Sequence, residues 1–179
     1  VPVIFIERSL SYVIPFLPKN TRAFYTAFLV AAFTEESFKY LAFILIIWKN
    51  KNFNEKFDGI VYAVFISLGF AALENVGYVF QYGESTSYIR AFTSVPAHAL
   101  FGVTMGYYLG LAKFYAKQRT IFQIKALLYP IILHGIFDFI LMLGNYRLLF
   151  GFIPYVIFLY IDGFRRMNNL SRRSIFRKG

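Results

Sequence analysis

The sequence contains no cysteine, and acidic residues are scarce: nine Asp and Glu stand against 19 Lys and Arg among 179 residues. The absence of cysteine excludes disulfides, thiolate nucleophiles and thiolate metal sites. The shortage of acidic residues makes each one inside an apolar segment conspicuous, because a membrane-spanning helix normally excludes charge. Any chemistry therefore rests on carboxylates, histidines, lysines and hydroxyl groups.

Hydrophobic residues, by contrast, make up 58% of the chain, and aromatic residues make up 21%. A soluble domain of 179 residues has no core large enough to hide so much apolar surface. Repeated apolar runs of bilayer length predict an all-α fold, a polytopic transmembrane helical bundle. The net charge of +10 would suggest nucleic acid in a soluble protein. Here the basic residues lie between and after the apolar runs, so we expect the lipid bilayer, and no nucleic acid, as a partner.

About five spans are predicted, at residues 23–48, 57–82, 92–113, 126–144 and 146–163. Residues 1–18 are also apolar, but they carry Glu7, Arg8 and several prolines. This segment is interpreted as an interfacial helix or as the end of a truncated span, which leaves open whether an upstream span is missing. No long linker or internal repeat divides the chain, so residues 1–179 are expected to form a single integral membrane domain.

Basic residues alternate between the two ends of the predicted spans, which indicates the orientation. One side holds thirteen of them: Lys49, Lys51, Lys56, Lys113, Lys117, Arg119, Lys125, Arg165, Arg166, Arg172, Arg173, Arg177 and Lys178. The other side holds four: Lys19, Arg22, Arg90 and Arg147. The basic tail at 164–179 is therefore expected to be cytoplasmic, and the loop at 81–91 is expected to face outward.

Few ionisable residues lie inside the predicted spans, and they come from four of them. They are Glu35, Glu36, Lys39, Glu74, His98, His134 and Asp138. Each costs about 2.5–3.5 kcal/mol to insert, which makes each a candidate for function. A rise of about 1.5 Å per residue places most of them about 18–24 Å from the cytoplasmic ends, and His134 at about 12 Å. The hydrocarbon core is about 30 Å thick, so this shared depth predicts one common site.

Local spacing supports such a site. Either Glu35 or Glu36 can pair with Lys39 on one helix face, because these residues lie four and three positions apart. His134 and Asp138 are also four apart, so that the carboxylate can orient the imidazole or both can reach one ion.

Simpler interpretations exist for each group: a structural ion cluster around Lys39, hydrogen bonding between helices for Glu74 and Asn75, and a packed core histidine at His98. The glycines at 102, 106 and 110 are interpreted as a close helix–helix contact. With all four carboxylates ionised and only Lys39 opposing them, three negative charges remain uncompensated. Protonation or a bound cation would have to reduce that charge.

Two classes of function would use these residues. A hydrolase could activate water with a buried glutamate, while a histidine binds the oxyanion or protonates the leaving amine. A divalent metal such as zinc is an alternative, with His98, His134, Glu36 and Glu74 as candidate ligands. An ion- or proton-coupled transporter could use the same midplane carboxylates. The sequence has no inverted repeat and no pair of broken helices, which disfavours transport.

Four motifs in order along the chain resemble the PrsW family of intramembrane proteases. Residues 35–39 fit EExxK, residues 70–75 (FAALEN) fit FxxxEN, His98 stands in the following helix, and residues 134–138 (HGIFD) fit HxxxD. The resemblance covers roughly residues 23–145. The distantly related CAAX prenyl proteases have EExxxR, whereas the basic residue here is Lys39, one position earlier.

This resemblance implies cleavage of membrane-anchored proteins, typified by anti-sigma factors cut on their extracytoplasmic side, in a bacterial or archaeal cytoplasmic membrane. It implies catalytic roles for Glu35, Glu36, His98 and His134. Lys39, Glu74, Asn75 and Asp138 would support the site, with Asn75 positioning the substrate and Asp138 orienting His134. The expected mechanism is a glutamate-activated water, with no cofactor or with a single divalent metal. The motifs do not choose the base between Glu35 and Glu36, and a non-catalytic peptide-binding relative is a further alternative.

Overall fold

A computed structural model describes residues 2–144, 146–174 and 176, and those residues contain helices but no strand. The α-helices are α1 (Pro2–Ser11), α2 (Lys19–Tyr25), α3 (Thr34–Ala42), α4 (Lys56–Tyr82), α5 (Glu84–Phe92), α6 (Ser94–Phe114), α7 (Arg119–Met142) and α8 (Tyr146–Ser171). Two π-helices, η2 (Thr26–Phe33) and η3 (Phe43–Ile47), and two 3-10 turns, η1 (Ile14–Phe16) and η4 (Ala116–Gln118), join them. The prediction of an all-α fold is confirmed.

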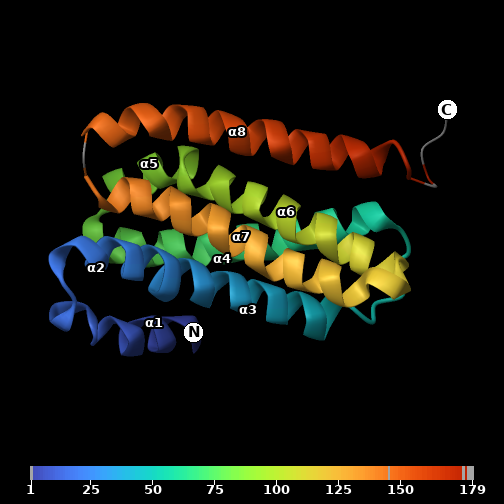
Figure 1. Cartoon of the computed structure of the whole chain (residues 1–179), viewed down its shortest axis with the longest axis horizontal. Helices are drawn as coiled ribbons and strands as arrows, with labels where there is room; N and C mark the ends of the chain where they lie inside the picture. The colour runs from blue at the N-terminus through green and yellow to red at the C-terminus, as the bar shows by residue number, and fades with distance from the viewer. Residues whose placement is uncertain (1, 145, 175, 177–179) are drawn as a thin grey trace.

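The long helices lie roughly side by side along one axis of the molecule (Figure 1). Helices α4, α6 and α7 form the centre, and α8 lies along one side of them. The helical run from α2 to η3 lies on the opposite side against α7, and α1 packs outside it against η2 and α3. Four of these elements, α3, α4, α6 and α7, carry the residues predicted to form the site.

Glycines hold α4 and α6 in close contact. A Cβ atom at Gly106 would overlap the backbone of Gly59, and one at Gly110 would overlap the carbonyl oxygen of Lys56. A Cβ atom at Gly102 would come within 2.7 Å of the Ser67 hydroxyl. The contact agrees with the interpretation of the glycine stripe as a helix–helix contact. It also fixes the position of His98 on α6 relative to Glu74 on α4.

The first predicted span, 23–48, corresponds to an unbroken helical run from Lys19 to Ile47, but the helix is not a regular α-helix. Its α segments alternate with the π-helices η2 and η3. A π-helix is wider than an α-helix and shifts the direction in which the following side chains point. Glu35 and Glu36 lie in the first turn of α3, which follows η2, and both are buried.

Two of the helices in the described residues are long and apolar enough to cross a membrane by length and composition, residues 56–81 and 116–142. These match the second and fourth predicted spans. The other three predicted spans also fold as helices, but their membrane crossing stays a prediction. Helix α6 is the central one, with most of its side chains buried against its neighbours.

Some helix boundaries differ from the prediction. The expected outer loop at 81–91 contains a helix, α5, and α7 begins at Arg119 instead of residue 126. Helix α8 continues through Ser171, so the first half of the expected tail is helical. Leu170 explains this extension, because its buried side chain packs in a cluster with residues of α4 and α6. Arg177 and Lys178 of the expected tail lie outside the described residues.

Candidate active site

The structure brings the predicted site residues from four helices together. Carboxylate oxygens of Glu35 and Glu36 and ring nitrogens of His98 and His134 all lie within 4.8 Å of one another, and all four residues are buried. Lys39 is on α3 with the two glutamates, Glu74 and Asn75 are on α4, His98 is on α6, and His134 and Asp138 are on α7.

Close packing between η2 and α7 allows this convergence. Gly135 follows His134 on α7, and a Cβ atom at this glycine would overlap the ring of Phe28 on η2. The missing side chain lets the two helices approach each other. As a result, the His134 ring reaches Glu36 on α3, the segment that continues η2.

The Lys39 ammonium group lies at the centre of the cluster and is fully buried. Its Nζ atom is 2.7 Å from Oε1 of Glu36 and 3.2 Å from Oε2 of Glu35. It is also 2.9 Å from Nδ1 of His98. An ammonium group has three N–H donors, so these three contacts use its whole capacity. The predicted pairing of both glutamates with Lys39 is present.

His134 lies between two carboxylates. Its Nδ1 is 2.9 Å from Oε1 of Glu36, and its Nε2 is 3.3 Å from Oδ2 of Asp138. The ring also stacks on Phe101, with 4.9 Å between the ring centroids. A carboxylate accepts hydrogen bonds, so the arrangement suits an imidazolium with a proton on each nitrogen. Asp138 therefore lies where it can orient His134.

His98 has an equivalent arrangement with different partners. Its Nδ1 faces Lys39, and its Nε2 is 3.2 Å from Oε2 of Glu74. The other carboxylate oxygen of Glu74 is 2.7 Å from Nη2 of Arg90 on α5. The Arg90 guanidinium lies over the ring of Tyr78, 3.7 Å from its centroid.

Arg90 and Tyr78 are parts of the site that were not predicted from the sequence. Arg90 lies in the segment expected to be a loop and was considered only as a charge that indicates orientation. Arg90 and Glu74 lie on different helices, so the spacing of residues along one helix cannot indicate that they are in contact. Asn75 was predicted to position the substrate, but it is not among the described residues that line the cavity next to the site.

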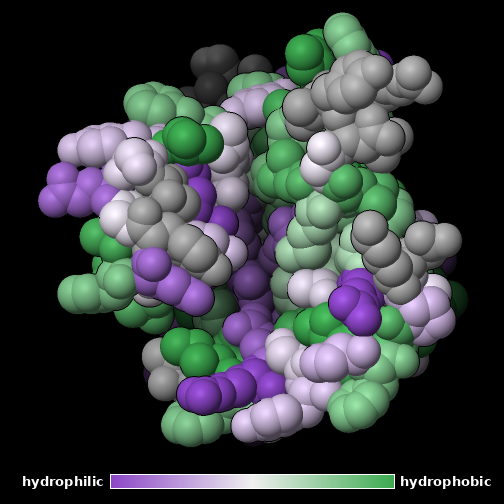
Figure 2. All heavy atoms as spheres, turned by 90° about the vertical axis from the view of Figure 1, so that its left-hand side faces the viewer, coloured by the Kyte–Doolittle hydropathy of each residue, from purple (hydrophilic) through white to green (hydrophobic). Residues whose placement is uncertain are grey.

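A cavity of about 600 Å³ opens beside the cluster. Its polar lining includes Glu35, Glu74, Arg90, His98 and His134, and its apolar lining comes largely from α1, α4 and η2. Figure 2, which faces the left-hand end of the molecule in Figure 1, shows hydrophilic side chains at the bottom of a cleft, with hydrophobic side chains along one of its walls. The cluster is thus buried but not sealed from this cavity.

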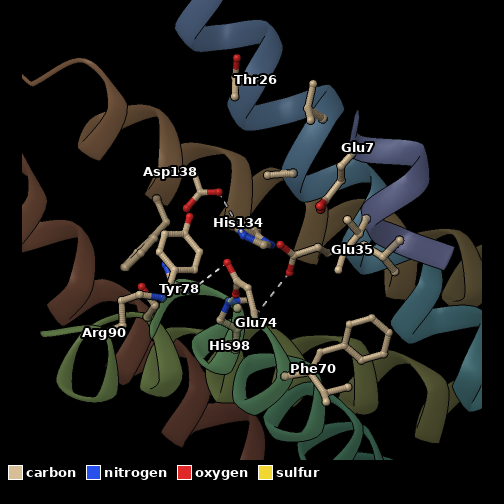
Figure 3. Close-up of a pocket in the computed structure, with 18 of the residues that line it drawn as sticks. Glu7, Thr26, Glu35, Phe70, Glu74, Tyr78, Arg90, His98, His134 and Asp138 are labelled. Carbon is tan, nitrogen blue, oxygen red and sulfur yellow. Dashed lines mark ion pairs between the residues drawn. The ribbon is translucent and has the colours of Figure 1, made fainter. Parts of the chain in front are cut away.

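Glu7 on α1 is a further carboxylate at the cavity that sequence analysis did not assign to the site. Figure 3 shows the carboxylates of Glu7, Glu35 and Glu74 directed toward a common space from three helices. Burial, and secondarily the charges of Glu35 and Glu74, raises the pKa of Glu7 to about 8. Glu7 is therefore mostly protonated at neutral pH and adds little negative charge.

The charges of the cluster are not fully balanced by its own residues. Its carboxylates are Glu35, Glu36, Glu74 and Asp138, and its permanent cations are Lys39 and Arg90. Arg90 therefore reduces the imbalance expected from the sequence from three charges to two, and an imidazolium at His134 reduces it to one. A divalent cation in place of a His134 proton would bring the cluster to neutrality.

The donor set also suits a divalent metal. Two imidazoles and a carboxylate form a common set of catalytic zinc ligands. Oε2 of Glu36 is buried and has no hydrogen-bond partner among the described residues, so a lone pair is available. Each histidine also has a second carboxylate at its other ring nitrogen, Glu74 or Asp138, as metal-bound histidines usually do. The buried residues Glu35, Glu36, His98 and His134 could hold a metal ion.

Comparisons with known proteins agree with this arrangement. The family described as PrsW family intramembrane metalloprotease matches residues 1–161. The chain is 40% identical to Protease PrsW of Clostridioides difficile (strain 630), over 85% of this chain and 68% of the relative. It is 38% identical to Protease PrsW of Bacillus subtilis (strain 168), over 92% of this chain and 74% of the relative. It is 35% identical to Protease PrsW of Oceanobacillus iheyensis, over 97% of this chain and 79% of the relative. No solved structure matches the chain. With this sequence similarity and the motif residues gathered in one buried cluster, the chain belongs to the PrsW family of intramembrane proteases.

Proposed function

We propose that the chain hydrolyses a peptide bond in membrane-anchored protein substrates. The observation that carries this proposal is a buried cluster of two glutamates, a lysine and two histidines beside a cavity of about 600 Å³. A structural ion cluster would need no such cavity. The cavity has room for a stretch of extended peptide, and its mixed polar and apolar lining suits a segment at the membrane boundary.

Glu35 is the better candidate for the base that activates water. It lines the cavity, and only one of its oxygens is engaged by Lys39. Glu36 is fully buried, does not line the cavity, and contacts both Lys39 and His134 through one oxygen. In this assignment Glu35 takes a proton from water as the hydroxide attacks the scissile carbonyl carbon. Glu36 holds Lys39 and His134 in place.

His134 then acts as the acid. It lines the cavity, and its two ring nitrogens face Glu36 and Asp138. Its imidazolium donates a proton to the leaving amine as the carbon–nitrogen bond breaks, and Asp138 holds the ring in orientation. His98 also lines the cavity, and its Nδ1 lies 3.8 Å from Oε2 of Glu35, where it helps to position the attacking water. Each proton removed from water is thus matched by one given to the amine.

A metal fits the same residues. Glu36, His98 and His134 would hold it, and a bound divalent ion would supply Lewis-acid activation of water and of the carbonyl. Glu74 and Asp138 would keep their contacts to Nε2 of the two histidines, whereas a metal ion at Nδ1 of His98 would replace the contact that Lys39 makes there. Metal analysis of the purified protein, together with activity after chelation, decides this point: full activity in metal-free protein would exclude the metal.

The proposed function also includes a topology in the membrane, which is inferred from the distribution of basic residues. The chain forms one membrane domain with five spans, and its basic C-terminal end lies in the cytoplasm. The cleft in Figure 2 lies at the end of the bundle that holds α5, which would then face outward. The scissile bond would lie on the extracytoplasmic side of a substrate of the anti-sigma-factor type, in the cytoplasmic membrane of a prokaryote.

The test uses purified protein in liposomes with a membrane-anchored model peptide. Cleavage by the wild type and its loss in Glu35→Gln, Glu36→Gln and His134→Ala are the expected results. Protein that folds and binds the peptide without cleaving it would make the chain a non-catalytic relative. Protein that instead moves ions across the liposomes would support the transporter alternative. Either result would overturn the proposal.

A further inference from the structure

We propose that Arg90 is a positioning residue of this active site: it fixes Glu74, which in turn fixes the tautomer and orientation of His98. Its role in catalysis rests on the proposed function, but its effect on His98 does not. The three residues come from three helices, α5, α4 and α6, and form a continuous series of contacts from the outer end of the bundle to Lys39.

The position of Arg90 is defined by two contacts. Its Nη2 atom is 2.7 Å from Oε1 of Glu74, with 15% of the Arg90 side chain exposed and 28% of that of Glu74. The guanidinium also lies over Tyr78 at 3.7 Å from the ring centroid. A guanidinium that is both stacked and paired has little freedom to rotate. Arg90 therefore holds the Glu74 carboxylate in one orientation; Figure 3 shows Arg90 beside Tyr78 and Glu74.

The contacts of His98 determine which of its nitrogens carries the proton. Lys39 can only donate hydrogen bonds, so the contact of 2.9 Å to its Nζ atom makes Nδ1 of His98 an acceptor. In the neutral ring the proton must then be on Nε2, which lies 3.2 Å from Oε2 of Glu74. The angle of this contact is not that of a well-formed hydrogen bond. A small rotation would align it, as is common at unliganded active sites.

This arrangement keeps the lone pair of Nδ1 directed into the cluster. The same nitrogen is 3.8 Å from Oε2 of Glu35, so it faces the place where water would be activated. Without Arg90, Glu74 would lose the cation that pairs with its carboxylate and would be free to rotate. His98 would then lack a fixed acceptor for its Nε2–H, and both tautomers would become accessible.

Nitrogen NMR of the protein labelled with ¹⁵N-histidine measures the tautomer directly. The chain has two histidines, so the spectrum contains two imidazoles, and the variant His134→Gln assigns the signal of His98. In the wild type we expect His98 to carry its proton on Nε2 alone. In Arg90→Gln we expect averaged signals of two tautomers. Arg22→Gln, which removes an exposed arginine of α2, should leave the spectrum unchanged.

Kinetics in liposomes provide the second readout. We expect Arg90→Gln to lower kcat by about 10- to 100-fold with little change in KM, because it acts on the site through His98. Arg90→Lys should restore part of the loss, since lysine can still pair with Glu74 but cannot stack on Tyr78 in the same way. The double variant Glu74→Gln/Arg90→Gln should be no less active than Glu74→Gln alone.

The proposal is overturned by either of two NMR results: a wild-type His98 protonated on Nδ1, or an Arg90→Gln spectrum identical to that of the wild type. Additive losses of activity in the double variant would also overturn it, since they would mean that Arg90 acts independently of Glu74. If Arg90→Gln does not fold, the wild-type spectrum and the Arg90→Lys variant still decide. If the tautomer changes as expected but neither the wild type nor any variant cleaves the peptide, the proposed function fails and the positioning role of Arg90 stands.

Discussion

Replacing Lys39 by methionine tests whether the buried cluster depends on its central ammonium group. Lys39 is fully buried and contacts both Glu36 and Glu35, at 2.7 and 3.2 Å. The methionine side chain is close in length to that of lysine and can pack near the ring of Phe70, over which the Nζ atom now lies at 5.8 Å. The substitution therefore removes the charge without leaving a large cavity.

The expected cost follows from the charges that remain. Removing one partner of a buried ion pair typically costs about 3–5 kcal/mol, because an uncompensated charge stays buried. A chain of this size loses roughly 2–4 °C in Tm per kcal/mol. Lys39→Met should therefore lower the unfolding temperature in detergent by about 6–20 °C. The double variant Lys39→Met/Glu36→Gln should recover part of this loss, because it removes one of the two carboxylate charges that Lys39 no longer compensates.

Thermal unfolding followed by circular dichroism or by a fluorescent probe is the appropriate assay. Lys49→Met is the matched control, because Lys49 is exposed near the end of the same helical run, and we expect it to change the Tm by at most a degree or two. A Lys39→Met protein as stable as this control would refute the reasoning. It would mean that the carboxylates of the cluster are already neutral, or that another cation compensates them.

Three further predictions follow from the packing and the site. Gly106→Ala should lower the free energy of unfolding by at least about 1–3 kcal/mol, since the new methyl group overlaps the backbone of α4; Gly69→Ala, with open space around it, should not lower it. Asp138→Asn should reduce kcat/KM about 10- to 100-fold while the protein stays folded, because His134 loses the carboxylate at Nε2, and unchanged kinetics would contradict that role. Glu36→Gln should reduce both activity and thermal stability, because Glu36 contacts two buried groups; a loss of activity alone would contradict its proposed supporting role.

The main features of the site could be predicted from the sequence because burying a charge in a membrane is expensive. Glu35, Glu36 and Lys39 on one helix, and His134 and Asp138 on another, have spacings that place each group on one face. Their common depth then predicted that the helices would bring them together. These patterns are local or depend only on the rise of a helix, so they can be recognised without knowing how the helices pack.

Other features depend on packing between segments far apart in the chain. The π-helix η2 has no distinctive residue pattern, but it precedes Glu35 and Glu36 and affects the direction of both side chains. Arg90 reaches Glu74 from a helix that the sequence suggested was a loop. The extension of α8 likewise depends on Leu170 packing against α4 and α6. None of these contacts leaves a periodic signal in the sequence.

The most direct test of the central claim is cleavage of a membrane-anchored peptide in liposomes prepared in H₂¹⁸O, followed by mass spectrometry. Hydrolysis by a water activated at the cluster predicts one ¹⁸O atom in the new carboxyl group of the product. It also predicts a rate about 10²–10⁴-fold lower for Glu35→Gln, with thermal stability close to that of the wild type. Cleavage at the wild-type rate by a folded Glu35→Gln protein would contradict the account.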